Sequence, residues 1–71
     1  MKLSIGEKIK IIMKRKGVNM TELAAATSQT RQNLSNKMSR DNFTEKEAHA
    51  IAAALGCEVV IEFRFPDGTS V

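Results

Sequence analysis

The chain has 71 residues, 11 lysines and arginines against 8 aspartates and glutamates, and a formal net charge of +3. A chain this short forms one domain that buries only about 60% of its unfolded surface, so a metal, a disulfide or self-association would help to stabilise it. The single cysteine, Cys57, and the single histidine, His49, exclude both a disulfide and a zinc site within one chain. Of these three sources of stability, self-association is the one that the sequence allows.

Several functional classes have no support in the sequence. It contains no glycine-rich phosphate loop, no nucleophile paired with a base and no cluster of metal ligands, so we expect no enzymatic activity, no cofactor and no small-molecule substrate. No stretch approaches the roughly 20 apolar residues of a membrane span, and the N-terminus lacks the apolar segment of a signal peptide. We therefore expect a cytoplasmic protein that does not associate with membranes.

Basic residues are concentrated near the N-terminus. Residues 1–16 contain six lysines and arginines against one glutamate, whereas the remaining residues carry a net negative charge. A second, smaller basic cluster consists of Arg31, Lys37 and Arg40. This distribution suits a surface that contacts phosphates, and a solvated lysine face on a helix explains it equally well.

The first predicted helix begins after Ser4. Ser4 and Glu7 have the spacing of a capping box, in which each side chain accepts a hydrogen bond from the other residue's backbone amide. Gly17 can adopt the left-handed conformation that closes a helix, so the helix should end near residue 16. The side chains at helical spacing that we expect to be buried are Ile5, Ile9, Ile12 and Met13.

Two short helices follow. Asn19 and Glu22 repeat the capping spacing and predict a second helix over residues 20–26. Its inward side chains should be Leu23 and either Ala26 or Thr27. A third helix should begin after Thr30, its predicted N-cap, and cover residues 31–39.

The third helix has two different faces. Leu34 and Met38 are four residues apart and fall on one side, whereas Gln32 and Asn36 fall on the opposite side. Exposed amides can hydrogen-bond to solvent, to a protein partner or to base edges in the DNA major groove, where they pair bidentately with adenine.

A fourth helix should begin at Thr44, which again has a glutamate, Glu47, three residues later. Gly56 should terminate this helix, and Phe43 precedes the cap, where it can close the base of the core. His49 falls off the apolar stripe and should lie at the surface. The apolar stripe consists of Ala48, Ile51, Ala52 and Leu55.

The apolar period then changes from 3.6 to 2. Over residues 57–65 every odd position is apolar and three of the four even positions are charged, which predicts a half-buried strand. A lone strand has unpaired backbone groups, and the simplest partner is the same strand of a second copy, antiparallel about a two-fold axis. The alternative is a hairpin that turns at Pro66-Asp67-Gly68 and returns through residues 69–71.

Residues 6–56 resemble the phage-repressor, or Cro-like (XRE-type), class of helix-turn-helix DNA-binding domains. The resemblance is carried by Glu22-Leu23-Ala24, by Leu34 and by Ala53-Ala54-Leu55-Gly56. It implies a mainly α fold with a four-helix, repressor-like helix-turn-helix domain over residues 1–56. Residues 57–71 would then form a C-terminal strand and tail that serve as the dimerisation element.

The resemblance also implies roles for individual residues, with residues 31–39 as the recognition helix. Base contacts would come from Arg31, Gln32, Asn33 and Asn36. Phosphate contacts would come from Thr30, Lys37, Arg40 and Asn42. The alternating pattern of residues 57–65, and not the resemblance, gives the dimer interface, which would be formed by Val59, Ile61, Phe63 and Phe65.

The chain departs from the family pattern at three places. Ser28 occupies the turn position where the family usually has glycine, so a non-glycine residue would adopt the left-handed conformation. Met13 and Met38 stand where many members have an arginine and a glutamate, and we expect these two side chains to touch. A strand follows the fourth helix where many relatives have a fifth helix.

These observations predict a sequence-specific DNA-binding transcriptional regulator, a repressor of phage, mobile-element or bacterial origin. Its partners would be double-stranded DNA and a second copy of itself, and the operator would be an inverted repeat. The alternative keeps the fold and changes the role to that of a protein-interaction module, such as an antitoxin or a partner that modulates a repressor.

Overall fold

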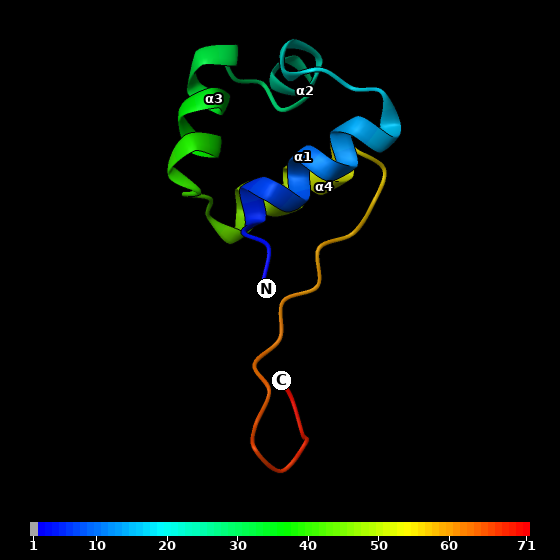
Figure 1. Ribbon diagram of the computed structural model, residues 1–71, viewed down its shortest axis with the longest axis vertical. Helices are drawn as coiled ribbons and strands as arrows, with labels where there is room; N and C mark the ends of the chain where they lie inside the picture. The colour runs from blue at the N-terminus through cyan, green and yellow to red at the C-terminus, as the bar shows by residue number, and fades with distance from the viewer. Residues whose placement is uncertain (1) are drawn as a thin grey trace.

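The computed structural model describes residues 2–71 and contains four helices (Figure 1). Helix α1 spans Ile5–Lys16, α2 spans Met20–Ala26, α3 spans Arg31–Arg40 and α4 spans Glu45–Ala54. In Figure 1, α2 lies at the top, α3 runs down the left side, and α1 and α4 lie below α2. The prediction of a mainly helical chain with four helices is confirmed. Among the described residues, no helix is long and apolar enough to cross a membrane.

Capping interactions set the ends of the helices. Complete capping boxes begin α1, α2 and α4, each with the predicted pair of residues. Helix α3 begins at Thr30, whose hydroxyl accepts a hydrogen bond from the amide of Asn33 at 3.0 Å. Gly17, with φ of 68°, closes α1 as predicted. Helix α3 runs to Arg40 and ends at Asp41, which takes the left-handed conformation with φ of 52°.

The core is built from one stripe on each helix. Leu34 on α3 is fully buried, and Met13 and Met38 are both buried in the same cluster, as the expected contact between these two side chains requires. Phe43 packs against the cluster from the loop before α4. The buried hydrophobic residues are Ile9, Met13, Leu23, Ala24, Leu34, Met38, Ala48, Ile51, Ala52 and Leu55.

Ile5 is the exception among the residues predicted to be buried, because 45% of it is exposed. It lies in the first turn of α1 and lines an open apolar groove. Ile12 is half-buried, at the edge of the core. The buried residues of α2 are Leu23 and Ala24. Of the two alternatives predicted to face inward beside Leu23, Thr27 at the C-cap is half-buried and Ala26 is exposed.

The predicted strand over residues 57–65 is absent, and this correction has a simple cause. A strand requires a neighbour that pairs with its backbone groups, and residues 58–62 have none within the described chain. The chain instead turns back at its end, as in the hairpin alternative: Arg64 and Ser70 form an isolated antiparallel bridge. The amides of Phe63 and Phe65 donate to the carbonyls of Val71 and Thr69 at 2.6 and 2.8 Å.

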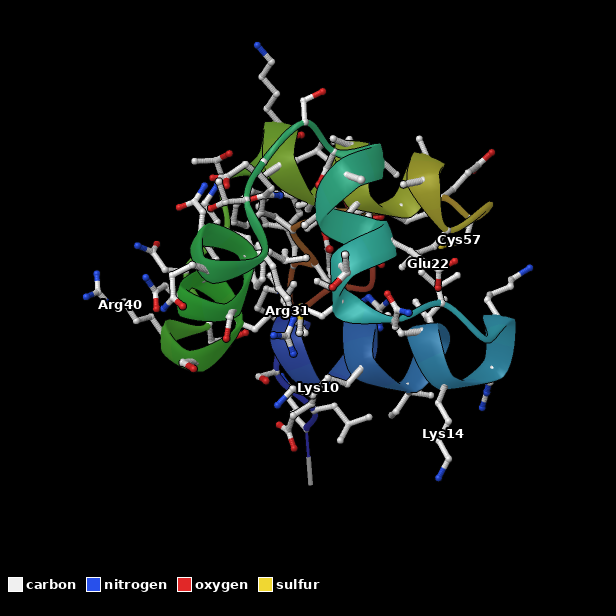
Figure 2. All side chains as sticks on the ribbon, turned by 90° about the horizontal axis from the view of Figure 1, so that it is seen from above. Lys10, Lys14, Glu22, Arg31, Arg40 and Cys57 are labelled. Carbon is white, nitrogen blue, oxygen red and sulfur yellow. The ribbon has the colours of Figure 1, made fainter. Side chains whose placement is uncertain are left out.

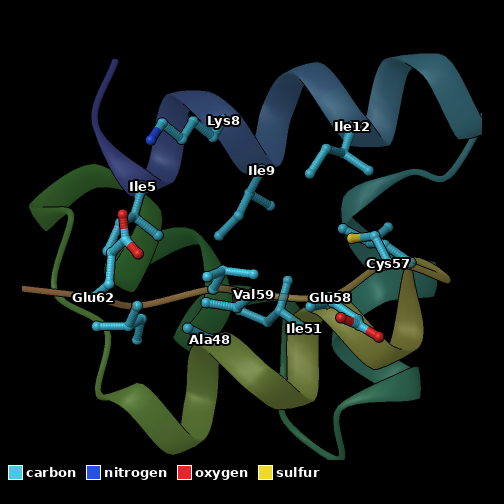
Figure 3. Close-up of a pocket in the computed structure, with 14 residues that line it drawn as sticks. Ile5, Lys8, Ile9, Ile12, Ala48, Ile51, Cys57, Glu58, Val59 and Glu62 are labelled. Carbon is cyan, nitrogen blue, oxygen red and sulfur yellow. The ribbon is translucent and has the colours of Figure 1, made fainter. Parts of the chain in front are cut away.

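The segment that follows α4 borders an apolar groove of about 510 Å³ (Figure 3). Ile9 and Ile12 line the groove from α1, Ile51 lines it from α4, and Val59 lines it from the extended segment. Beyond this groove the chain leaves the helical part and ends in the hairpin (Figure 1). The exposed apolar side chains of the tail, residues 57–71, are Val60, Ile61, Phe63, Phe65 and Val71.

Candidate nucleic-acid interface

The outer face of α3 carries exposed amide side chains. Gln32 and Asn36 are both exposed, whereas Leu34 and Met38 on the opposite face are buried, as the helical spacing predicts. The amide nitrogen of Gln32 donates a hydrogen bond to Oδ1 of Asn36 at 3.2 Å. The two side chains thus lie together, one turn apart, and both retain free donors and acceptors that face solvent.

A second set of polar side chains connects the end of α2 to the first turn of α3. Nδ2 of Asn33 donates to Oε1 of Gln29 at 3.2 Å, and Nε2 of Gln29 donates to the hydroxyl of Thr27 at 2.8 Å. The Thr27 hydroxyl in turn donates to the carbonyl of Leu23 at 2.8 Å. Between them Ser28 adopts the left-handed conformation with φ of 55°, as expected. Asn33 is therefore held in place by the connection between the two helices.

Sequence reasoning missed Gln29, although a signal for it was present. Gln29 precedes Asn33 by four residues, which is the spacing at which side chains meet on a helix. Gln29 lies in the connection, outside the predicted helices, where helical spacing alone does not predict a contact with Asn33.

Basic residues flank the amide surface at both ends of α3. Arg31 in the first turn and Arg40 in the last turn are exposed, and neither forms an ion pair within residues 2–71. Figure 2 shows Arg40 projecting from α3 and Lys10 and Lys14 projecting from α1. Thr30 is exposed, and its hydroxyl accepts from the amide of Asn33, so its own proton remains available to a phosphate oxygen.

Lys37 differs from the two arginines because it already has an anionic partner. Its ammonium forms an ion pair with the carboxylate of Glu47, which lies in the first turn of α4. The Lys37 ammonium, together with the backbone amide and hydroxyl of Thr44, holds the pKa of Glu47 below its ordinary value. Asn42 is exposed nearby, and its amide donates to the carbonyl of Lys37 at 3.1 Å.

The end of α3 is also attached to α1. Oδ1 of Asp41 accepts a hydrogen bond from the amide of Gly6 at 2.6 Å, so it satisfies one of the free amides at the start of α1. A Cβ atom on Gly6 would lie 3.1 Å from this oxygen and 3.2 Å from the carbonyl oxygen of Met38. The close approach of the two helices therefore depends on a glycine at this position. The sequence did not predict the contacts of Gly6 with Asp41 and Met38, because Gly6 is far from both residues in the chain.

A family model described as a domain of unknown function, DUF6471, matches residues 4–60. The chain belongs to the DUF6471 family. The match covers all four helices and ends within the extended segment, before the hairpin. No curated protein and no solved structure matches the chain.

In this DUF6471 domain the residues predicted to contact DNA lie on or next to α3, and Lys37 is the one among them that is paired with an acidic residue. Of the four residues assigned to a dimer interface, Val59 is half-buried and lines the groove, whereas Ile61, Phe63 and Phe65 are exposed. Within residues 2–71 there is no group of three or more histidine, cysteine or acidic side chains placed to hold a metal ion.

Proposed function

We propose that this protein is a sequence-specific DNA-binding transcriptional regulator of the repressor type. In this proposal α2 and α3 form a helix-turn-helix unit, and α3 enters the major groove as the recognition helix. Arg31, Gln32, Asn33 and Asn36 contact base edges. Thr30, Lys37, Arg40 and Asn42 contact phosphates, which fix the register of the protein on the duplex without reading sequence.

The observation that carries the proposal is the exposed, uncharged amide surface of α3. A helix held to the core by Leu34 and Met38 directs Gln32 and Asn36 outward, and arginines flank them at both ends. Amides that offer a donor and an acceptor together match the adenine edge in the major groove, and the flanking cations match the phosphate backbone. If this face of α3 contacted only solvent, amides flanked by arginines would bind nothing better than other polar side chains would.

The active species in this proposal is a homodimer joined through residues 57–65. The backbone of residues 58–62, which has no hydrogen-bond partner in another backbone segment within residues 2–71, and the exposed side chains of Ile61, Phe63 and Phe65 would be buried against a second copy. A two-fold axis places the two recognition helices in successive major grooves, about 34 Å apart, and gives an operator that is an inverted repeat.

Selection of bound sequences from a random DNA pool tests the proposal directly. We expect enrichment of an inverted repeat whose half-sites are centred about 10 base pairs apart or a multiple of that spacing. Affinity for the enriched sequence should fall steeply as salt is raised, because phosphate contacts release counterions. Failure to enrich any sequence, together with undetectable affinity at low salt, would reject DNA binding.

The apolar tail supports a second candidate function, that of a protein-interaction module such as an antitoxin or a partner of a repressor. Phe63 and Val60 are 73% and 78% exposed, and a different protein can cover them as well as a second copy can. Isolation of bound proteins from cells with and without nuclease treatment separates the candidates. Partners that persist after nuclease treatment, without any selected DNA sequence, would favour this second function.

A further inference from the structure

Glu47 takes part in two interactions at the boundary between α3 and α4. Its Oε1 accepts a hydrogen bond from the backbone amide of Thr44 at 3.1 Å, and its own amide donates to the Thr44 hydroxyl at 3.1 Å. Its other carboxylate oxygen, Oε2, pairs with the ammonium of Lys37 on α3. Because the capping box holds Glu47 in place, Lys37 is the member of the ion pair that can move to another partner.

The energy of this pair allows such an exchange. The side chains of Lys37 and Glu47 are 28% and 27% exposed, so the pair lies at the protein surface, although the Oε2 atom itself is covered. Ion pairs at the protein surface contribute little to stability, so the exchange of one partner for another costs little. A DNA phosphate is an equally strong acceptor for an ammonium group, and Arg40 and Asn42 would hold a phosphate beside the same end of α3.

We propose that Glu47 lowers the affinity for DNA by holding Lys37, and that DNA binding transfers the Lys37 ammonium from Glu47 to a phosphate. This inference rests on the proposed function and adds an element of regulation to it. Glu47 has two separable effects: it stabilises the start of α4, and it makes DNA compete for Lys37. A purely structural role for Glu47 predicts the opposite outcome, because loss of a stabilising contact would weaken DNA binding.

The variant Glu47→Gln separates these two effects. Glutamine occupies the same position in a capping box and its Oε1 accepts the same backbone hydrogen bond, so α4 should retain its N-terminal cap. The uncharged amide cannot hold Lys37 as an ion pair. We expect Glu47→Gln to bind the selected operator about two- to fivefold more tightly at constant salt, which is the fold-change equivalent of a partly exposed ion pair.

A control variant and a double variant test whether the gain depends on Lys37. Glu7 closes the same kind of capping box on α1 and has no ion-pair partner within residues 2–71, so Glu7→Gln measures the effect of removing one negative charge. In a Lys37→Met background, Glu47→Gln should give no more than that general effect. Lys37→Met should also lower the slope of log affinity against log salt by about 0.9, because one phosphate contact is lost.

The outcomes are distinguishable. Operator binding by the wild-type protein with no gain in Glu47→Gln, or a gain that persists in full with Lys37→Met, would overturn the inference and leave the proposed function intact. Undetectable DNA binding by the wild-type protein and by every variant would reject the proposed function, and the inference with it. Circular dichroism on each variant confirms that the helices are retained.

Discussion

At the scale of single residues, the exposed amides of α3 are already paired with each other. The hydrogen bond between Gln32 and Asn36 lies on an exposed helix face, where such i, i+4 pairs contribute only a few tenths of a kcal/mol. A base edge can therefore replace it at little cost. In the proposed complex, the pair would orient both side chains before DNA binds, which would lower the conformational entropy lost on binding.

The proposed roles of these amides predict a difference between two kinds of substitution. Gln32→Ala or Asn36→Ala should lose discrimination of about 1–3 kcal/mol at one or two operator positions and change affinity for unrelated DNA little. Arg40→Ala should weaken binding to all sequences alike and reduce the salt slope by about one. Fluorescence anisotropy with the operator and its single-base variants, at several salt concentrations, measures both effects. Uniform weakening by Gln32→Ala would contradict base readout.

A second residue-scale prediction concerns the contact between Gly6 and Asp41. Alanine usually stabilises a helix relative to glycine, but a Cβ on Gly6 would crowd Asp41 and the backbone of α3. Gly6→Ala should therefore lower the free energy of unfolding. Asp41→Ala should cost about 1 kcal/mol, because it leaves the Gly6 amide without its hydrogen bond.

Asp41→Asn is the matched control for this contact. Asparagine retains an acceptor oxygen and tolerates the left-handed conformation, so it should recover most of the stability lost in Asp41→Ala. Urea unfolding of all three variants gives the comparison. An increase in stability for Gly6→Ala would show that the end of α3 can move away from α1.

At the scale of helices, the pair formed by Lys37 and Glu47 predicts a dependence of stability on pH. The pKa of Glu47 is lowered in the folded chain, so its contribution is fully present above the unfolded carboxyl pKa of about 4.3 and is lost as pH falls through the lower folded value. Protonated Glu47 is uncharged, as glutamine is, and so cannot form the ion pair with Lys37. The melting temperatures of the wild-type protein and Glu47→Gln should therefore differ near pH 7 and converge near pH 3. A difference that stays constant over this range would contradict the assignment.

The helices could be predicted from the sequence because their signals are local. Capping residues lie three positions from their partners, and a glycine closes α1, so the starts and the first end followed from short stretches of sequence. The same is true of the two faces of α3. Amide exposure at Gln32 and burial at Leu34 both follow from helical spacing alone.

The strand was predicted wrongly, and the ion pair between Lys37 and Glu47 was not predicted, because both depend on contacts between distant parts of the chain. The alternation over residues 57–65 describes which side chains prefer burial, but a strand also needs a partner, and the sequence does not say where that partner is. The pairing of Lys37 with Glu47 and the contact of Gly6 with Asp41 depend on how helices pack, which spacing along one helix does not determine.

At the scale of the whole molecule, the chain is long for its size. It measures 43 Å along its longest axis and 24 and 23 Å across, because the tail projects from the helical part (Figure 1). The tail lies at the end opposite α2, so a second copy bound there would leave the turn between α2 and α3 uncovered. In the proposed assembly, dimerisation through the tail would therefore leave the turn between α2 and α3 accessible to DNA.

The last prediction tests that dimer. Phe63 is 73% exposed in the single chain, and a carboxylate at this position would be buried unpaired in a tail-to-tail interface. Phe63→Asp should therefore sediment as a monomer at concentrations where the wild-type protein is a dimer, and should lose about 100-fold or more in affinity for the inverted repeat. Affinity for an isolated half-site should not change. Ile11→Asp, at an exposed apolar position on α1, is the control and should remain dimeric. A wild-type protein that is monomeric with and without operator DNA would contradict the dimer and leave the tail free for a different partner.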